Sequence, residues 1–135
     1  MSMTCVVCGG KMVSAGDTCR YDECGLEGVT LKGVAVRRCA KCREREVAIP
    51  NIEGLHRAIA RWLAVRPWPS GGAEVRFLRK WLGYSGADFA AVMGVEPETV
   101  SRWEHGRRSL GPGAERALRL LVLRGEPVDS YDANF

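Results

Sequence analysis

The chain has 135 residues, of which 46% are hydrophobic and 27% charged, so it should fold and not remain disordered. Its formal net charge of +4 permits a nucleic-acid partner but does not require one. No secretory leader opens the sequence, and no apolar run approaches the ~20 residues that span a bilayer, which predicts a cytoplasmic protein without membrane contact. The chain has six cysteines, and in that compartment paired cysteines are expected to be metal ligands or redox groups and not structural disulfides.

The first fifty residues are rich in Cys, Gly and Val and contain no convincing helix pattern. Residues 30–36 suggest two short strand pieces around Lys32-Gly33, and residues 21–23 suggest a part of another strand. The sequence therefore predicts a small β-rich module at this end of the chain.

Two CxxC pairs dominate this module, Cys5 with Cys8 and Cys39 with Cys42. Each CxxC turn brings two thiolates together, and a following glycine lets backbone N–H groups approach the sulfurs. Two such turns on neighbouring loops supply the four soft ligands that a tetrahedral zinc ion requires. A redox dithiol would be expected in a βαβ context, which is not visible here. We therefore expect one structural Zn²⁺ per chain. Four thiolates leave no open coordination position for a substrate or water, so we do not expect the chain to be an enzyme.

Cys19 and Cys24 have a looser spacing, and no histidine lies near them. They are interpreted as free or half-buried thiols. A thiol pair that senses oxidation and a competing pair of metal ligands remain alternative interpretations.

A helix is predicted from Asn51, a good N-cap, to about Val65. Its apolar face comprises Ile52, Leu55, Ile59, Trp62 and Leu63. Pro67 and Pro69 end it and open a Pro/Gly-rich segment. We therefore expect a zinc-binding domain with a trailing helix over residues 1–66, a linker over 67–72, a helical domain over 73–125 and a tail over 126–135. The fold class is α+β.

Four helices are predicted in the second domain, over residues 73–82, 86–93, 97–104 and 113–123. Ala90 is the small residue expected where two helices cross, and Gly94 provides the positive φ of a tight turn. Pro97 occupies the first position of the next helix, while Val100 and Trp103 face inward. This pattern is typical of a helix-turn-helix. Trp62, Trp68 and Trp81 are interpreted as packing residues.

The outward side chains of the third of these helices would enter the major groove of double-stranded DNA. Arg102 can pair with guanine, Thr99 and Ser101 can bind bases or phosphates, and Glu98 can accept from cytosine. The expected phosphate contacts are Arg107 and Arg108 after that helix and Arg76, Arg79 and Lys80 on the first.

Several segments occur together in a known order: Cys5-x-x-Cys8, Cys39-x-x-Cys42, Ile49-Pro50-Asn51-Ile52-Glu53, Arg76-Phe77-Leu78-Arg79-Lys80-Trp81-Leu82-Gly83 and Val100-Ser101-Arg102-Trp103-Glu104-His105-Gly106. Over residues 5–124 the chain thus resembles the YgiT-type zinc-finger proteins of the MqsA antitoxin family. Its second half also resembles the wider Cro/phage-repressor (XRE) helix-turn-helix group.

The resemblance implies a structural zinc, a homodimer that binds a palindrome in its own promoter, and a zinc domain that neutralises a ribonuclease toxin. Arg102 matches the family's base-reading arginine. Glu98 replaces an asparagine that reads a base in the best-known member, so the operator sequence does not carry over.

The main functional hypothesis is therefore a DNA-binding transcription repressor of antitoxin type. The alternatives are a zinc-stabilised protein-interaction module whose helical domain serves dimerisation, and a stand-alone repressor that senses oxidation through Cys19 and Cys24. The last helix is apolar almost all round, which predicts that part of it forms the dimer interface; its apolar residues are Leu118, Leu120, Leu121, Val122 and Leu123.

Overall fold

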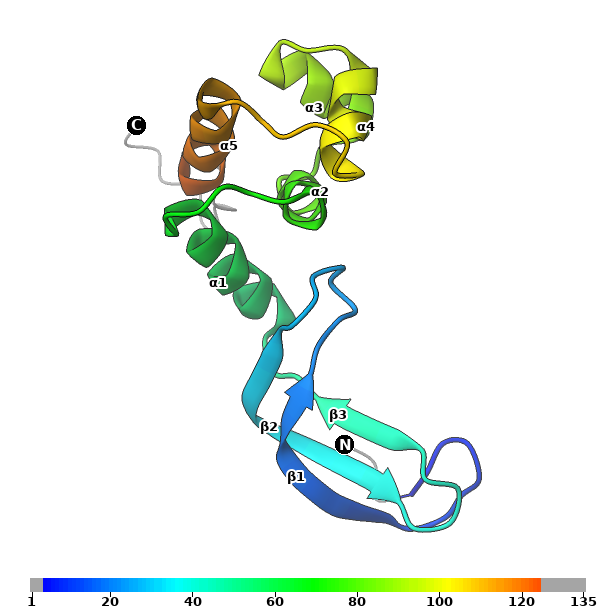
Figure 1. Ribbon diagram of the computed structural model, residues 1–135. Helices are drawn as coiled ribbons and strands as arrows, with labels where there is room; N and C mark the ends of the chain where they lie inside the picture. Colours follow the sequence, from blue (N-terminus) through cyan, green and yellow to red (C-terminus); the bar gives the residue numbers. More distant parts are fainter. Residues whose placement is uncertain (1–3, 125–135) are drawn as a thin grey trace, which may run out of the picture. The chain divides into compact units, whose positions relative to one another are not determined.

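The computed structural model describes residues 4–124, which form two compact units with the division after Ile52 (Figure 1). The first unit is a three-stranded antiparallel sheet that carries the cysteines, and the second is made of helices. The α+β fold class predicted from the sequence is confirmed. None of the helices in the described part of the chain combines the length and the hydropathy needed to cross a membrane.

The sheet has the strand order β1-β2-β3, with β1 over Met12–Arg20, β2 over Thr30–Cys39 and β3 over Arg45–Ala48. Strand β2 is one continuous strand and not two pieces, because Gly33 adopts a φ of 75° within it without ending the pairing. Residues 21–23 do not form a strand, although Tyr21 is buried.

Strands β1 and β3 were not predicted because neither shows a strict alternation of apolar and polar residues. Only Met12 and Cys19 are buried along β1, and the pairing of β1 with β2 shifts register around Gly16. Strand β1 is therefore held by its pairing with β2 more than by a buried face of its own.

The helices agree with the predicted segments and extend over Ile52–Val65 (α1), Gly72–Trp81 (α2), Gly86–Met93 (α3), Pro97–Glu104 (α4) and Pro112–Arg124 (α5). Their common core contains fully buried apolar side chains from α2 to α5, namely Val75, Leu78, Phe89, Ala90, Val100, Leu118 and Val122. The ring of Trp103 packs edge-on against Phe89, at 6.5 Å between centroids. The inward positions predicted for Val100 and Trp103 are confirmed.

Helix α1 buries only part of the predicted face, since Leu63 is buried and Leu55 and Ile59 are half-buried. Ala60, Leu63 and Ala64 are buried, whereas Ile52 and Trp62 are 45% and 54% exposed. Two of the three buried residues are alanines, which the spacing of the larger apolar residues did not single out. Asn51 has a φ of 53°, the left-handed region that asparagine tolerates, and not the extended conformation of an N-cap.

The proline-rich segment after α1 is fastened to α5. Arg119 donates hydrogen bonds to the carbonyl groups of Arg66 and Trp68, and Ser70 donates to the Glu115 carboxylate from its backbone N–H (3.1 Å) and from its hydroxyl (2.7 Å). The bonds from Ser70 and Arg119 outweigh the desolvation of Glu115 and lower the pKa of its carboxyl group. Contacts therefore group α1 with the later helices, whereas the sequence placed the boundary at 67–72.

Trp62 and Trp68 were expected to be packing residues, but they remain about half exposed. The Arg66 guanidinium lies over both rings, 5.5 Å and 5.2 Å from their centroids, and forms an ion pair with Glu74. The two indoles thus cover a buried arginine and do not enter the core.

Candidate metal centre and nucleic-acid interface

The four cysteines of the CxxC pairs meet at one end of the sheet. Cys5 and Cys8 lie before β1, Cys39 is the last residue of β2, and Cys42 lies in the turn to β3. The register pairs Met12 with Cys39, and a bridge between Thr4 and Lys11 closes the first loop onto the same end. Strand pairing therefore positions both cysteine loops.

The sulfur atoms have the spacing of a tetrahedral site. Cys5 Sγ lies 3.6 Å from Cys42 Sγ, Cys8 Sγ lies 3.4 Å from Cys39 Sγ, and all four sulfurs lie within 4.8 Å of one another. A tetrahedron with metal–sulfur bonds of about 2.3 Å has edges of about 3.8 Å. The four side chains can hold one metal ion and fit zinc.

Backbone N–H groups surround the sulfurs. Cys5 Sγ accepts from the N–H of Val7, and Cys8 Sγ accepts from the N–H of Gly10, each at 3.4 Å. Such bonds stabilise thiolates and orient them. The glycine is required by space, because a Cβ at Gly10 would lie 2.9 Å from Cys39 Sγ and 3.2 Å from Cys8 Sγ.

The thiols of the metal-free chain differ in acidity. The backbone N–H groups of Cys42 and Lys41 donate to Cys39 Sγ and lower the pKa of that thiol to about 6. A backbone hydrogen bond at Glu44 acts to lower the pKa of Cys42, but the hydrogen bonds among the cysteine sulfurs and the burial of the thiol outweigh it and raise this pKa to about 12. Zinc binds cysteine as the thiolate, so each thiol of the cluster that still carries a proton must lose it, and metal binding releases protons.

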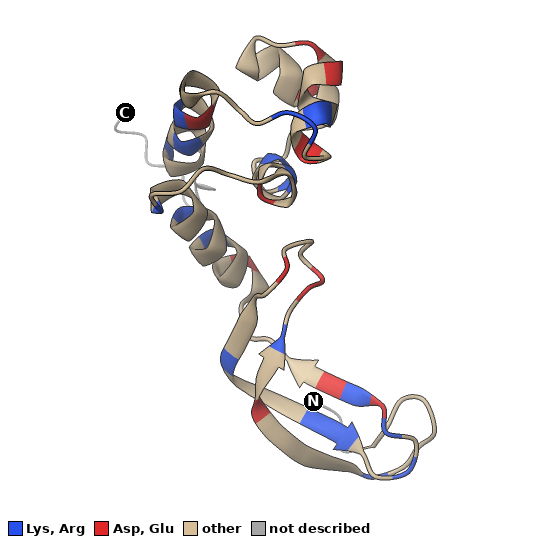
Figure 2. Cartoon of the chain, viewed as in Figure 1, with Lys and Arg blue, Asp and Glu red and all other residues tan. Residues whose placement is uncertain are grey.

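Basic residues gather at the cysteine end of the sheet, along the end of β2 and the turn to β3 (Figure 2). They are Arg37, Arg38, Lys41, Arg43 and Arg45. A zinc ion with four thiolates carries two negative charges, which these cations would partly offset.

Replacing Gly10 by alanine should weaken zinc binding by about 10- to 100-fold, because the new Cβ displaces ligand sulfurs. Competition with a chromophoric chelator measures the affinity. Val6→Ala, in a side chain that is 90% exposed in the same loop, is the matched control and should bind zinc like the wild type. Equal affinities for all three proteins would show that the glycine is not required.

Cys19 and Cys24 lie outside this cluster. Cys19 is buried, its thiol donates to the carbonyl of Arg20 at 3.1 Å, and Cys24 is half-buried. Both are free thiols, and neither belongs to a group of metal-ligating side chains within residues 4–124. These positions agree with the interpretation as free or half-buried thiols.

Helices α3 and α4 form a helix–turn–helix through local signals in the sequence. Ser85 caps α3 by accepting from the N–H of Asp88 at 3.1 Å. Gly94 ends α3 with a φ of 70°, and Pro97 stands in the first turn of α4. The turn residues and the helix bounds agree with the prediction.

Helix α4 has one buried face and one exposed face. Val100 and Trp103 are buried, whereas Glu98, Ser101 and Arg102 are exposed and Thr99 is half-buried. Arg107 and Arg108, also exposed, follow the helix, and their N–H groups bond to the carbonyl of Arg102. The structure therefore brings all six predicted DNA-contact residues onto α4 and the turn after it.

Arg79 does not belong to this exposed set, although the sequence grouped it with phosphate-binding residues. Its guanidinium donates to the Glu104 carboxylate at 2.9 and 3.1 Å and to the carbonyl of Tyr84 at 3.0 Å. The pair ties α2 to α4 and is mostly buried, with side-chain exposures of 13% and 10%. Arg76 and Lys80 remain exposed on α2.

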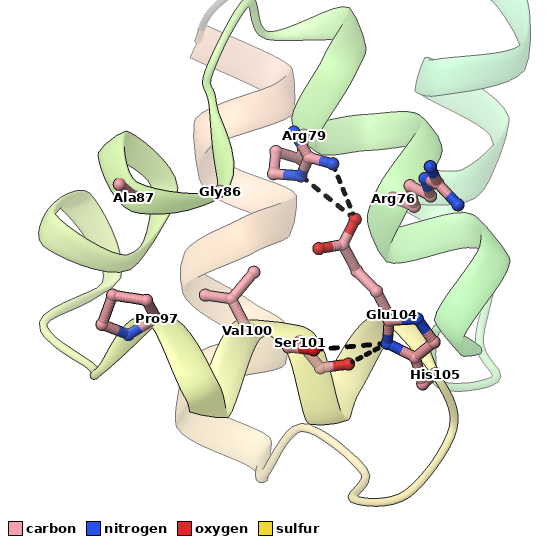
Figure 3. Close-up of a pocket in the computed structure, with 9 residues that line it drawn as sticks. All are labelled: Arg76, Arg79, Gly86, Ala87, Pro97, Val100, Ser101, Glu104 and His105. Atoms are coloured by element: carbon pink, nitrogen blue, oxygen red, sulfur yellow. Dashed lines mark hydrogen bonds and ion pairs between the residues drawn. The ribbon is translucent and has the colours of Figure 1, made fainter.

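A hollow of about 270 Å³ lies between α2, α3 and α4 beside this ion pair (Figure 3). Arg76 comes from α2, Gly86 and Ala87 from the first turn of α3, and Ser101 from α4, while His105 follows α4 directly. Ser101 thus borders both the hollow and the exposed face of α4. The hollow was not predicted, because it depends on how three helices pack.

Residues 75–120 match the helix-turn-helix family HTH_3. The match extends from α2 into α5 and includes the whole of α3, the turn and α4. No curated protein matches the chain. Together with the exposed face of α4, the family match supports a DNA-binding transcription regulator of the XRE type.

Proposed function

We propose that the protein is a homodimeric transcription repressor of antitoxin type that recognises a palindromic operator through α4. The observation that carries this proposal is the division of α4 into a buried apolar face and an exposed face with Glu98, Ser101 and Arg102. A recognition helix needs both, because one face fixes it to the domain and the other contacts base edges in the major groove.

In this interface Arg102 donates to O6 and N7 of a guanine, and Glu98 accepts from N4 of a cytosine. Thr99 and Ser101 bind base edges or phosphates, and Arg107 and Arg108 bind the backbone after the helix. The chain acts by binding and not by catalysis. A zinc ion held by four cysteines would supply structural stability and no reactive position.

Binding-site selection from a random duplex library tests the operator. Inverted repeats should be enriched, with half-site centres about 34 Å apart, because the two recognition helices of a dimer enter successive major grooves. Selected sequences that contain a single half-site without an inverted repeat would contradict recognition of the operator by a dimer. A library that yields no common sequence would contradict sequence-specific recognition.

The apolar side of α5 supports the homodimer. A groove of about 440 Å³ runs between α3 and α5 and is lined by apolar side chains and one cation, namely Val92, Met93, Ala117, Leu120, Leu121 and Arg124. Leu120 is 59% exposed and Leu123 40% exposed, whereas Leu118 and Val122 belong to the core of the single chain. None of the predicted DNA-contact residues lines this groove, so a second copy can occupy it without using them.

Replacing Leu120 by aspartate should therefore convert the dimer to a monomer, because it buries a charge in an apolar contact. Sedimentation velocity at micromolar concentration measures the mass, and Arg116→Ala on an exposed part of α5 is the control. A monomeric wild type would contradict the proposed homodimer, and an aspartate variant that stays dimeric would place the interface elsewhere.

The toxin-neutralising part of the proposal rests on the zinc module. The side chains of Val6 and Val7, between the first two cysteines, are 90% and 66% exposed, and such apolar surface is typical of a protein contact. The same observation favours the alternative of a zinc-stabilised interaction module. Co-expression with any ribonuclease-like protein encoded beside this gene tests it: the wild type should restore growth and Val6→Asp should not.

A further inference from the structure

The hollow between α2, α3 and α4 has the lining of an anion site (Figure 3). Arg76, Ser101 and His105 all border it, and all three residues are exposed. Within residues 4–124, Arg76 has no ion-pair partner. The hollow adjoins the face of α4 that is proposed to enter the major groove. When α4 lies in that groove, the anion nearest to the hollow is a phosphate of the DNA backbone.

The charges around His105 leave an excess of positive charge. Helix α2 contributes Arg76 and Arg79, α4 contributes Glu104, and α3 lines the hollow with the uncharged Gly86 and Ala87. Arg79 and Glu104 neutralise each other. Outside the lining, the same elements carry Asp88 in the first turn of α3 and Arg107 and Arg108 after α4.

One proton decides what the His105 ring can offer a phosphate. Its Nδ1 lies 2.7 Å from the carbonyl oxygen of Ser101 and 3.4 Å from the hydroxyl of the same residue. A carbonyl oxygen can only accept, so Nδ1 carries the hydrogen of the neutral ring. The other nitrogen, Nε2, is then an acceptor and cannot bond to a phosphate oxygen. A second proton turns Nε2 into a donor and gives the ring a positive charge.

We propose that the hollow seats a DNA backbone phosphate and that His105 is a proton-gated contact to it, so that operator binding strengthens as the pH falls. This inference rests on the proposed DNA-binding function. The sign follows from linkage: the complex holds the second proton of His105 more tightly than the free protein does, so the complex binds more protons and is favoured by acid. Histidine is the side chain whose charge changes between about pH 8 and about pH 6.

The test is a fluorescence-anisotropy titration of the zinc-loaded full chain with its selected operator, from about pH 8 to about pH 6. The affinity of the wild type should rise by at least about threefold per half-site over this range. Its salt dependence should also steepen, because each protonated ring adds one phosphate contact to the slope of log K against log salt. His105→Gln should show neither effect, because the glutamine side chain gains no proton over this range.

The chain has only one other histidine, His56, so a histidine-dependent change in DNA affinity can be assigned to one of two residues. His56 lies on α1 with its ring edge-on to Phe77 at 5.8 Å, and His56→Gln should retain the full pH profile of the wild type. Parallel pH profiles for the wild type and His105→Gln would overturn the inference while leaving DNA binding intact. Failure of the wild type to bind any selected sequence at either pH would instead overturn the proposed function.

Discussion

Removal of the metal should unfold the sheet and leave the helices folded. The buried cluster at the cysteine end consists of Met12, Cys5 and Cys39, so two of its three members are also candidate metal ligands. Structural zinc in small domains supplies about 10–16 kcal/mol of binding free energy, which exceeds the stability that so small a core can provide. The helical unit has its own core and contributes no ligand to the metal site.

Amide spectra recorded before and after chelation measure this effect. The resonances of β1 to β3 should lose their dispersion, while those of α2 to α5 keep their positions. Cys39→Ser should reproduce the apo spectrum, whereas Cys24→Ser, outside the metal cluster, is the matched control and should not. A sheet that keeps its dispersed resonances after complete metal removal would show that the metal is not structural.

Replacing Glu104 by alanine should destabilise the helical unit by about 3–5 kcal/mol, because it leaves the mostly buried guanidinium of Arg79 without its counter-charge. The carbonyl of Tyr84 alone remains to satisfy that group. Without the ion pair, α2 and α4 should separate, and the exposed face of α4 should shift from its position in the domain. Urea denaturation followed by helical circular dichroism measures the change.

Glu98→Ala is the matched control, since it removes an exposed carboxylate from the same helix and should change the free energy of unfolding by less than about 0.5 kcal/mol. The double variant Arg79→Met/Glu104→Leu should recover much of the lost stability, because it removes both charges and keeps the volume. A loss below about 1 kcal/mol for Glu104→Ala would mean that the ion pair is not a tie between the helices.

The elements that the sequence predicts well are those with local chemical signals. Gly94 and Pro97 fix the turn and the start of α4 through backbone conformation alone, and the CxxC spacing fixes both cysteine loops. The four-cysteine cluster and the exposed face of α4 follow from those signals. They were predictable because each depends on residues close together in the chain.

The remaining features depend on pairings between distant residues. Strand β1 is polar and bulged, so only its partner β2 reveals it, and the ion pair of Arg79 with Glu104 joins residues 25 positions apart. The attachment of α1 to the helical unit relies on Arg119 and Glu115, more than 40 residues after the segment that they hold. The composition of that segment, rich in proline and glycine, is that of a linker, and nothing in it indicates these contacts.

The measurement that tests the central claim most directly compares the wild type with Arg102→Ala on the selected operator and on random DNA of equal length, by fluorescence anisotropy across a salt series. The wild type should prefer its operator, and the variant should lose about 1–3 kcal/mol of that preference while its affinity for random DNA changes little. Arg116→Ala, exposed on α5, should retain the preference. If the wild type binds operator and random DNA equally, or if Arg102→Ala keeps the full preference, α4 is not the element that reads the sequence.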